Sequence, residues 1–164
     1  MGLIVYMVLT DYLNKKTILI NPSVKDRWEL IESMLDVAIK NKAVKSEYRE
    51  TIKKTLFERE KSMSTGIGKG VAIPHCSCPY VDDVVMILAL SKKGINFDSI
   101  DNLPVHIAIL LIVPKDKISQ HIKTLANIAK LMSDDALREA LSNAKDAQDI
   151  IKILKEYEQK GKKQ

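Results

Sequence analysis

The residues that decide the fold read Val84-Val85-Met86-Ile87-Leu88-Ala89-Leu90 and, after a break, Val105-His106-Ile107-Ala108-Ile109-Leu110-Leu111-Ile112-Val113. Both runs are almost wholly apolar, and Pro104 and Pro114 flank the second. Strands that are covered on both faces have this character, whereas strands with one solvated face alternate between apolar and polar residues. We therefore predict two central strands of one sheet, with a turn or short edge strand over residues 94–98.

Apolar residues at helical spacing precede and follow these strands. The first predicted helix covers residues 24 to about 41, with Ser23 as its N-cap and Asp26 as the capping-box partner. Helices on both sides of a strand-rich middle predict an α/β fold with a mixed β-sheet sandwiched between helices on both faces. The remaining predicted elements are strands at 17–20 and 71–73 and helices from about 46 to 59, 118–132, 134–141 and 146–157.

The bulk composition is that of one ordinary globular domain of 164 residues, with 46% hydrophobic and 29% charged residues. The net charge is +5, but residues 155–164 contain four lysines and two glutamates and so supply +2 of it. The remaining +3 forms no basic cluster interleaved with aromatic residues, which argues against nucleic-acid binding. Cys76 and Cys78 are expected to be free thiols, and the apolar segment 3–9 is far shorter than the roughly 20 residues of a membrane span.

Candidate functional residues gather in the segment from Arg59 to Cys76. Three of the six glycines fall within residues 66–70, and His75 follows Pro74 directly. Glycines allow a backbone to approach a charged group closely, and a histidine nitrogen can carry a transferable group. The glycines fit neither the dinucleotide fingerprint nor the P-loop, because no glycine stands three residues after Gly68 and Gly70 follows Lys69.

Other chemistry remains open from the residues alone. A zinc site at His75, Cys76 and Cys78 has unusually tight spacing, and neither His106 nor His121 completes a metal-ligand motif. Composition does not exclude a nucleophilic cysteine or serine, although no nucleophile-elbow sequence is present. The residues alone leave His75 equally open to a structural role at a strand end and to a functional role.

A resemblance to a known family distinguishes these alternatives. Arg59-Glu60, Ser64-Thr65-Gly66-Ile67-Gly68 and Val71-Ala72-Ile73-Pro74-His75 resemble the active-site signature of the fructose/mannitol-type IIA domains (EIIA type 2) of the bacterial phosphoenolpyruvate-dependent phosphotransferase system. The segments 97–105, 110–114 and 121–126 also resemble the family, so the similarity spans about residues 7–154. The family fold that this implies is again a mixed sheet between helices.

The resemblance implies a role for each matching residue. His75 corresponds to the phosphoryl acceptor, His121 to the second family histidine and Arg59 to the active-site arginine. Ser64, Thr65, Gly66 and Gly68 are expected to stabilise the phosphoryl group, without a metal or other cofactor. His106 has no family counterpart and is interpreted as a strand residue, and Cys76 stands where the family usually has a small residue.

The resemblance also implies partners. A phosphocarrier protein similar to HPr would donate the phosphoryl group to His75, and a IIB domain or regulatory target proteins would respond to it. The segments 64–75 and 97–105 most resemble nitrogen-regulatory members, so we expect a regulator, with a sugar-uptake component as the alternative. We expect a cytoplasmic protein without stable membrane insertion or a fused IIB domain. Its expected parts are an extension at 1–6 (with Met7 as an alternative start), a domain at 7–155 and a basic tail at 156–164.

Overall fold

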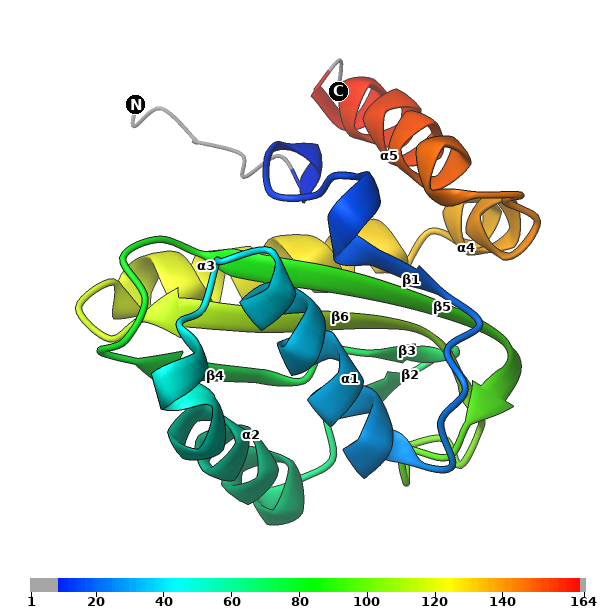
Figure 1. Cartoon of the computed structure of the whole chain (residues 1–164). Helices are drawn as coiled ribbons and strands as arrows, with labels where there is room; N and C mark the ends of the chain where they lie inside the picture. Colours follow the sequence, from blue (N-terminus) through cyan, green and yellow to red (C-terminus); the bar gives the residue numbers. More distant parts are fainter. Residues whose placement is uncertain (1–8, 163–164) are drawn as a thin grey trace.

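The computed structural model describes residues 9–162, and within them six strands form one mixed sheet (Figure 1). The two apolar runs form its centre: β5 (Val85–Ile95) pairs antiparallel with β6 (Val105–Pro114), with Ile87 opposite Leu110. The strand order is β1-β5-β6-β3-β2, and β4 also pairs with β6. The remaining strands are β1 (Ile18–Ile20), β2 (Gly66–Gly68), β3 (Val71–Ala72) and β4 (His75–Cys78).

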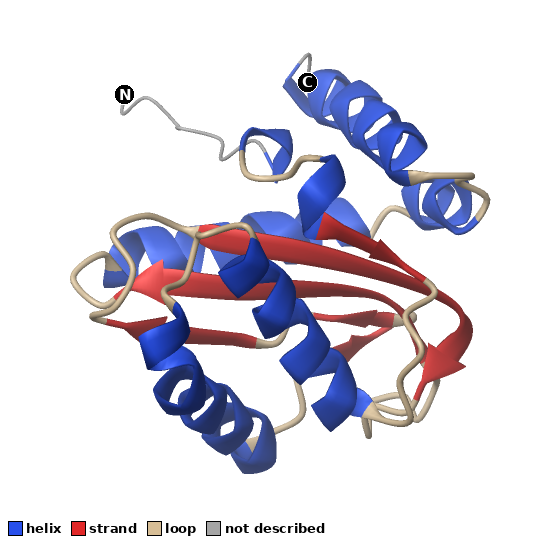
Figure 2. Ribbon diagram, viewed as in Figure 1, coloured by secondary structure: helices blue, strands red, loops and turns tan. Residues whose placement is uncertain are grey.

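Helices cover both faces of the sheet, as predicted (Figure 2). Side chains on β5 and β6 alternate between two hydrophobic cores because successive residues of a strand point to opposite faces. Ile87 and Leu110 face the core under the first two helices, whereas Leu88 and Ile109 face the core under the last three. These helices are α1 (Arg27–Lys40), α2 (Arg49–Ser62), α3 (Ile118–Met132), α4 (Asp135–Ser142) and α5 (Ala147–Lys162), and short 3-10 turns lie at Leu9–Asp11, Lys15–Thr17 and Ser46–Tyr48.

The first helix begins later than predicted. Asp26, and not Ser23, is its N-cap: the Asp26 side chain accepts a hydrogen bond from the Glu29 backbone N–H at 2.9 Å. Glu29 in turn accepts the backbone N–H of Lys25 at 2.8 Å. An aspartate satisfies the free N–H groups of a first turn as well as a serine does, so the cap moves three residues along the chain.

Two further features differ from the sequence prediction: an additional strand and the end of the last helix. Residues 66–68 form the edge strand β2, because a turn at Gly68, Lys69 and Gly70, all with positive φ (95°, 57° and 78°), folds them back on β3. Positive φ is readily adopted by glycine, which explains the two glycines of this turn. At the C-terminal end, α5 continues to Lys162, five residues beyond the predicted end of its helix.

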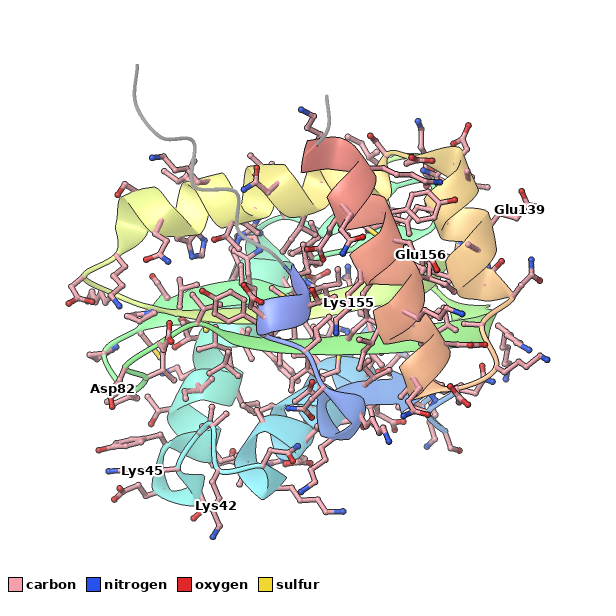
Figure 3. All side chains as sticks on the ribbon, turned by 90° about the horizontal axis from the view of Figure 1, so that it is seen from above. Lys42, Lys45, Asp82, Glu139, Lys155 and Glu156 are labelled. Atoms are coloured by element: carbon pink, nitrogen blue, oxygen red, sulfur yellow. The ribbon has the colours of Figure 1, made fainter. Side chains whose placement is uncertain are left out.

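Charged side chains are spread over the surface. Lys42 and Lys45 project outward from the segment between α1 and α2, whereas Lys155 and Glu156 lie side by side on α5 (Figure 3). Within residues 9–162, no helix is long and apolar enough to span a membrane. The N-terminal extension expected at 1–6 lies outside the described residues.

Candidate active site

The candidate nucleophile lies where the sheet pairing is interrupted and resumes. β3 ends at Ala72, and the chain re-enters the sheet at His75, which pairs in parallel with Leu111 of β6. Pro74 separates the two strands because it lacks an N–H for the ladder, while its carbonyl still accepts the Leu111 N–H at 3.0 Å. His75 and Ser77 therefore face α3, opposite to Cys76 and Cys78 in the core under α1 and α2.

The imidazole of His75 is held in one tautomer. Its Nδ1 lies 2.7 Å from the carbonyl oxygen of Ile73, and since a carbonyl only accepts, Nδ1 carries the proton. A neutral His75 then has its lone pair on Nε2. Among the described residues Nε2 has no hydrogen-bond partner, and in contrast to His121 Nδ1 it is not fully buried. The reactive nitrogen is therefore available to an incoming group.

The two histidines separated by 46 residues in sequence meet here. His121 lies in the first turn of α3, and its ring centroid is 5.4 Å from that of His75, with the ring planes at 61°. His121 Nδ1 is buried without a hydrogen-bond partner among the described residues. Burial lowers the pKa of His121, so this ring is largely neutral near pH 7.

Arg59 completes the group from the last turn of α2. Its guanidinium donates to the Met63 carbonyl oxygen at 2.7 Å, which holds the arginine at the end of the helix. Burial lowers the pKa of His75, and the charges of Arg59 and of protonated His121 lower it further, whereas the bond to Ile73 acts in the opposite direction. The structure thus places His121 in ring contact with His75, and Arg59 close enough for its charge to act on the His75 ring.

Three of the four predicted phosphoryl-stabilising residues, Ser64, Thr65 and Gly66, use donors for internal hydrogen bonds. Thr65 donates its hydroxyl to Glu60 at 2.6 Å, and Ser64 donates its hydroxyl to the Phe97 carbonyl. The Gly66 N–H donates to Ser64 Oγ at 3.1 Å. Gly66 also lies so close to Ser99 that a Cβ there would be 2.2 Å from Ser99 Oγ. Gly68 belongs to the β2–β3 turn described above.

Two charged residues next to Thr65 were assigned no role from the sequence, although Glu60 stands in the quoted family signature. Glu60 is 1% exposed and pairs with Arg27 of α1 at 3.2 Å. Its burial has a readable signal, because Glu60 continues the row of buried Ile52 and Leu56 at four-residue spacing on α2. The pairing with Arg27, 33 residues away, has no such signal.

Cys76 and Cys78 lie on the other face of β4, and both are buried free thiols. The neighbouring Cys76 thiol, with the backbone N–H groups of Tyr80 and Val81, lowers the pKa of Cys78. The proximity of Cys78 and burial raise the pKa of Cys76. Within residues 9–162, no three His, Cys, Asp or Glu side chains are placed to hold a metal ion.

The remaining histidine and a groove along α5 lie elsewhere. His106 is the second residue of β6 and places Nδ1 2.8 Å from the Ser91 carbonyl oxygen of β5. A shallow groove of about 700 Å³ lies along α5, which covers the opposite edge of the sheet at β1. Lys152 and Glu156 line part of that groove. None of the residues that line this groove is His75, His121 or Arg59.

Comparison with known proteins confirms the resemblance. The family described as "Phosphoenolpyruvate-dependent sugar phosphotransferase system, EIIA 2" matches residues 11–157. The chain belongs to this EIIA type 2 family. A nitrogen regulatory protein of Bradyrhizobium diazoefficiens is 30% identical to it over 90% of this chain and 95% of that protein. The fructose-specific EIIABC component of Bacillus subtilis is also 30% identical, over 93% of this chain, which spans only 24% of that longer protein.

Solved structures have the same EIIA architecture. The nitrogen regulatory protein IIA-Ntr of Neisseria meningitidis matches with a TM-score of 0.82 and 26% identity, over 90% of this chain and 99% of that one. The Escherichia coli mannitol IIA enzyme, solved in complex with phosphorylated mannitol IIB, matches with a TM-score of 0.73 and 17% identity over 87% of this chain and 96% of that one. At 17% identity, the match to the mannitol IIA enzyme confirms the fold alone.

Proposed function

We propose that this EIIA protein is a phosphohistidine carrier, with His75 as the phosphoryl acceptor. The observation that carries the proposal is the state of one side chain: His75 has Nδ1 fixed on the Ile73 carbonyl and Nε2 without a partner among the described residues, in ring contact with His121 and within the electrostatic influence of Arg59. A lowered pKa keeps His75 neutral near pH 7, and only neutral imidazole is a nucleophile.

The transfer needs only one bond exchange. His75 Nε2 attacks the phosphorus of a phosphohistidine on an HPr-like carrier, and the N–P bond to the carrier breaks as the new N–P bond forms. The proton stays on His75 Nδ1, hydrogen-bonded to the Ile73 carbonyl oxygen, throughout. Because such transfers pass through a loose transition state with charge on the equatorial oxygens, the protein contributes positioning and electrostatic stabilisation.

Two hydrogen-bond donors, the Arg59 cation and the His121 ring, are placed to supply that stabilisation. Arg59 can exchange its bond to the Met63 carbonyl for a stronger bond to a phosphoryl oxygen, because charge-assisted bonds to phosphate exceed bonds to neutral carbonyls. His121 contributes a second donor from the first turn of α3. Ser64 and Thr65 contribute chiefly by holding the backbone, since their hydroxyls are engaged with Phe97 and Glu60.

Exposed apolar side chains beside these donors suit a protein donor better than a small molecule. Met63, next to the Arg59 guanidinium, is 71% exposed, and Ile122, next to His121, is 62% exposed. Apolar residues exposed around a polar centre are typical of protein interfaces. We propose an HPr-like carrier as the partner that covers them.

For the biological role, we propose a cytoplasmic regulator of the nitrogen-related type. The similarity to the Bradyrhizobium nitrogen regulatory protein, which extends over nearly that whole protein, supports this choice. Phosphorylation adds a charge of about −1.5 to −2, which is large beside the +3 of residues 1–154 and can change partner binding. The alternative is a sugar-uptake IIA component that passes phosphate to a IIB domain, as the fructose-specific relative supports.

Phosphotransfer followed by site mapping tests the proposal. Purified protein is incubated with a radiolabelled, phosphorylated HPr-like carrier, and the labelled residue is then mapped. We expect acid-labile label on His75 alone; label on another residue, or none, would overturn the proposal. Onward transfer to a fructose or mannitol IIB domain would favour sugar uptake, whereas partners captured selectively by the unphosphorylated protein or by a phosphomimetic form would favour regulation.

A further inference from the structure

Glu60 is the most completely buried charged side chain near His75. It is 1% exposed, and its carboxylate accepts three hydrogen bonds from one residue: two from the Thr65 N–H, at 3.2 Å to each oxygen, and one from the Thr65 hydroxyl at 2.6 Å. Arg27 adds an ion pair at 3.2 Å and also donates to the Phe97 carbonyl oxygen at 2.7 Å. Burying a carboxylate is costly unless it is paired and hydrogen-bonded, and here both conditions are met.

Hydrogen bonds linked through the backbone of Thr65 and of Ile73 connect this carboxylate to His75. Glu60 holds Thr65, and the Thr65 carbonyl accepts the N–H of Ile73 at 3.0 Å. The carbonyl of the same Ile73 receives the Nδ1–H of His75 at 2.7 Å. The orientation of the Ile73 carbonyl thus depends on Thr65 on one side and on the β4–β6 pairing on the other.

We propose that Glu60, neutralised by Arg27, is a positioning residue for His75. By fixing Thr65 and Ile73 it keeps the Nδ1–H tautomer of His75 and leaves Nε2 as the reactive nitrogen. Its effect on phosphotransfer rests on the function proposed above, whereas its effect on the tautomer does not. Glu60 itself touches no reacting atom, so its loss changes the orientation of His75 and not the docking of the carrier.

The substitution Glu60→Gln tests this role directly. A glutamine presents an NH₂ group where Thr65 and Arg27 both donate, so at least one donor loses its acceptor. We expect ¹⁵N NMR of the His75 ring to show a larger share of the Nε2–H tautomer, and kcat for phosphate incorporation to fall about tenfold or more at unchanged KM. Glu58→Gln, an exposed glutamate of the same helix, is the matched control and should equal wild type.

A second pair of variants decides the question if Glu60→Gln does not fold. Thr65→Val keeps the shape and the backbone N–H but removes the 2.6 Å hydroxyl bond, and Thr65→Ser retains that hydroxyl. We expect Thr65→Val to shift the tautomer and lower kcat in part, and Thr65→Ser to preserve both. Folded variants with the wild-type tautomer and kcat, or with only KM raised, would overturn the positioning role.

The outcomes separate this inference from the proposed function. If wild-type protein takes no phosphate on His75, the carrier function fails, and the NMR tautomer comparison still decides the role of Glu60. If wild-type protein is labelled on His75 and Glu60→Gln is labelled at the same rate with the same tautomer, the carrier function stands and the positioning role fails.

Discussion

His75 and His106 form the same hydrogen bond in different surroundings. Each is half-buried and places Nδ1 within 2.8 Å of a backbone carbonyl, that of Ile73 for His75 and that of Ser91 for His106. His106 packs against Gly94, where a Cβ would lie 3.4 Å from its Nε2. Neither Nε2 has a hydrogen-bond partner among the described residues. His75 instead has a second histidine in ring contact and an arginine whose charge acts on it. These two neighbours, and not the tautomer-fixing bond, distinguish the candidate nucleophile.

The largest expected effect is the loss of phosphorylation in His75→Gln, with His106→Gln as the comparison. His75→Gln should abolish acid-labile phosphate incorporation, because the amide lacks a nucleophilic nitrogen. His106→Gln should be labelled at the wild-type rate and lose about 1 kcal/mol of unfolding free energy with its bond to Ser91. Radiolabel transfer and chemical denaturation measure the two quantities. Label on the His75 variant, or its loss from a folded His106 variant, would reverse the comparison.

The next largest effect is expected at Arg59. Arg59→Gln should slow phosphorylation of His75 about a hundredfold, the usual cost of removing one transition-state donor from a preorganised site. Rapid quench-flow measurement of radiolabel incorporation gives the rate. Lys61→Gln, an exposed cation two residues away, controls for the loss of charge as such. Equal slowing in both variants would point to long-range attraction of the carrier and remove Arg59 from the site.

A smaller effect is expected at His121. His121→Ala should still be labelled, because His75 keeps its nucleophilic nitrogen and Arg59 remains, but about tenfold more slowly. This loss is smaller than the roughly hundredfold or more of a general acid–base group, because His121 is a second donor beside Arg59. The same labelling assay measures it. His121→Gln retains an N–H donor and is expected to recover part of the rate. Wild-type rates in the alanine variant would show that the 5.4 Å contact between the rings is structural only.

Sequence patterns predicted the elements whose signals are local. The apolar runs predicted β5 and β6 because a strand covered on both faces needs apolar residues throughout. The strand β2 was not predicted, because its residues Gly66-Ile67-Gly68 have low strand propensity and pair only after the turn at Lys69 folds them back. The N-cap moved from Ser23 to Asp26 because both residues suit a cap and tertiary packing chooses between them.

The candidate site was likewise predicted only in part. His75, His121 and Arg59 were identified through a family signature, and the structure brings them together from β4, α3 and α2. The engagement of the Thr65 hydroxyl with Glu60 was not readable, because a sequence names a donor without naming its acceptor. The Arg27–Glu60 pair arises from the packing of α1 against α2, which local patterns do not encode.

The smallest expected effect is a change in the pH dependence of His75, which tests whether the charge of Arg59 acts on its ring. Burial, Arg59 and protonated His121 all lower the pKa of His75 below its ordinary value of 6.5. Below pH 6.5 the unfolded state binds this proton more readily than the native state does. The contribution of His75 to the unfolding free energy therefore falls as the pH drops below 6.5, and it is constant at higher pH. NMR titration of the ring should show the pKa of His75 rising in Arg59→Gln, because one cation that disfavours imidazolium is gone. The fall in stability with acid should then be shallower than in wild type. An unchanged titration would mean that burial, His121 and the bond to Ile73 set the pKa without Arg59, and that Arg59 lies too far from the ring to act on it or on a phosphoryl group bound to it.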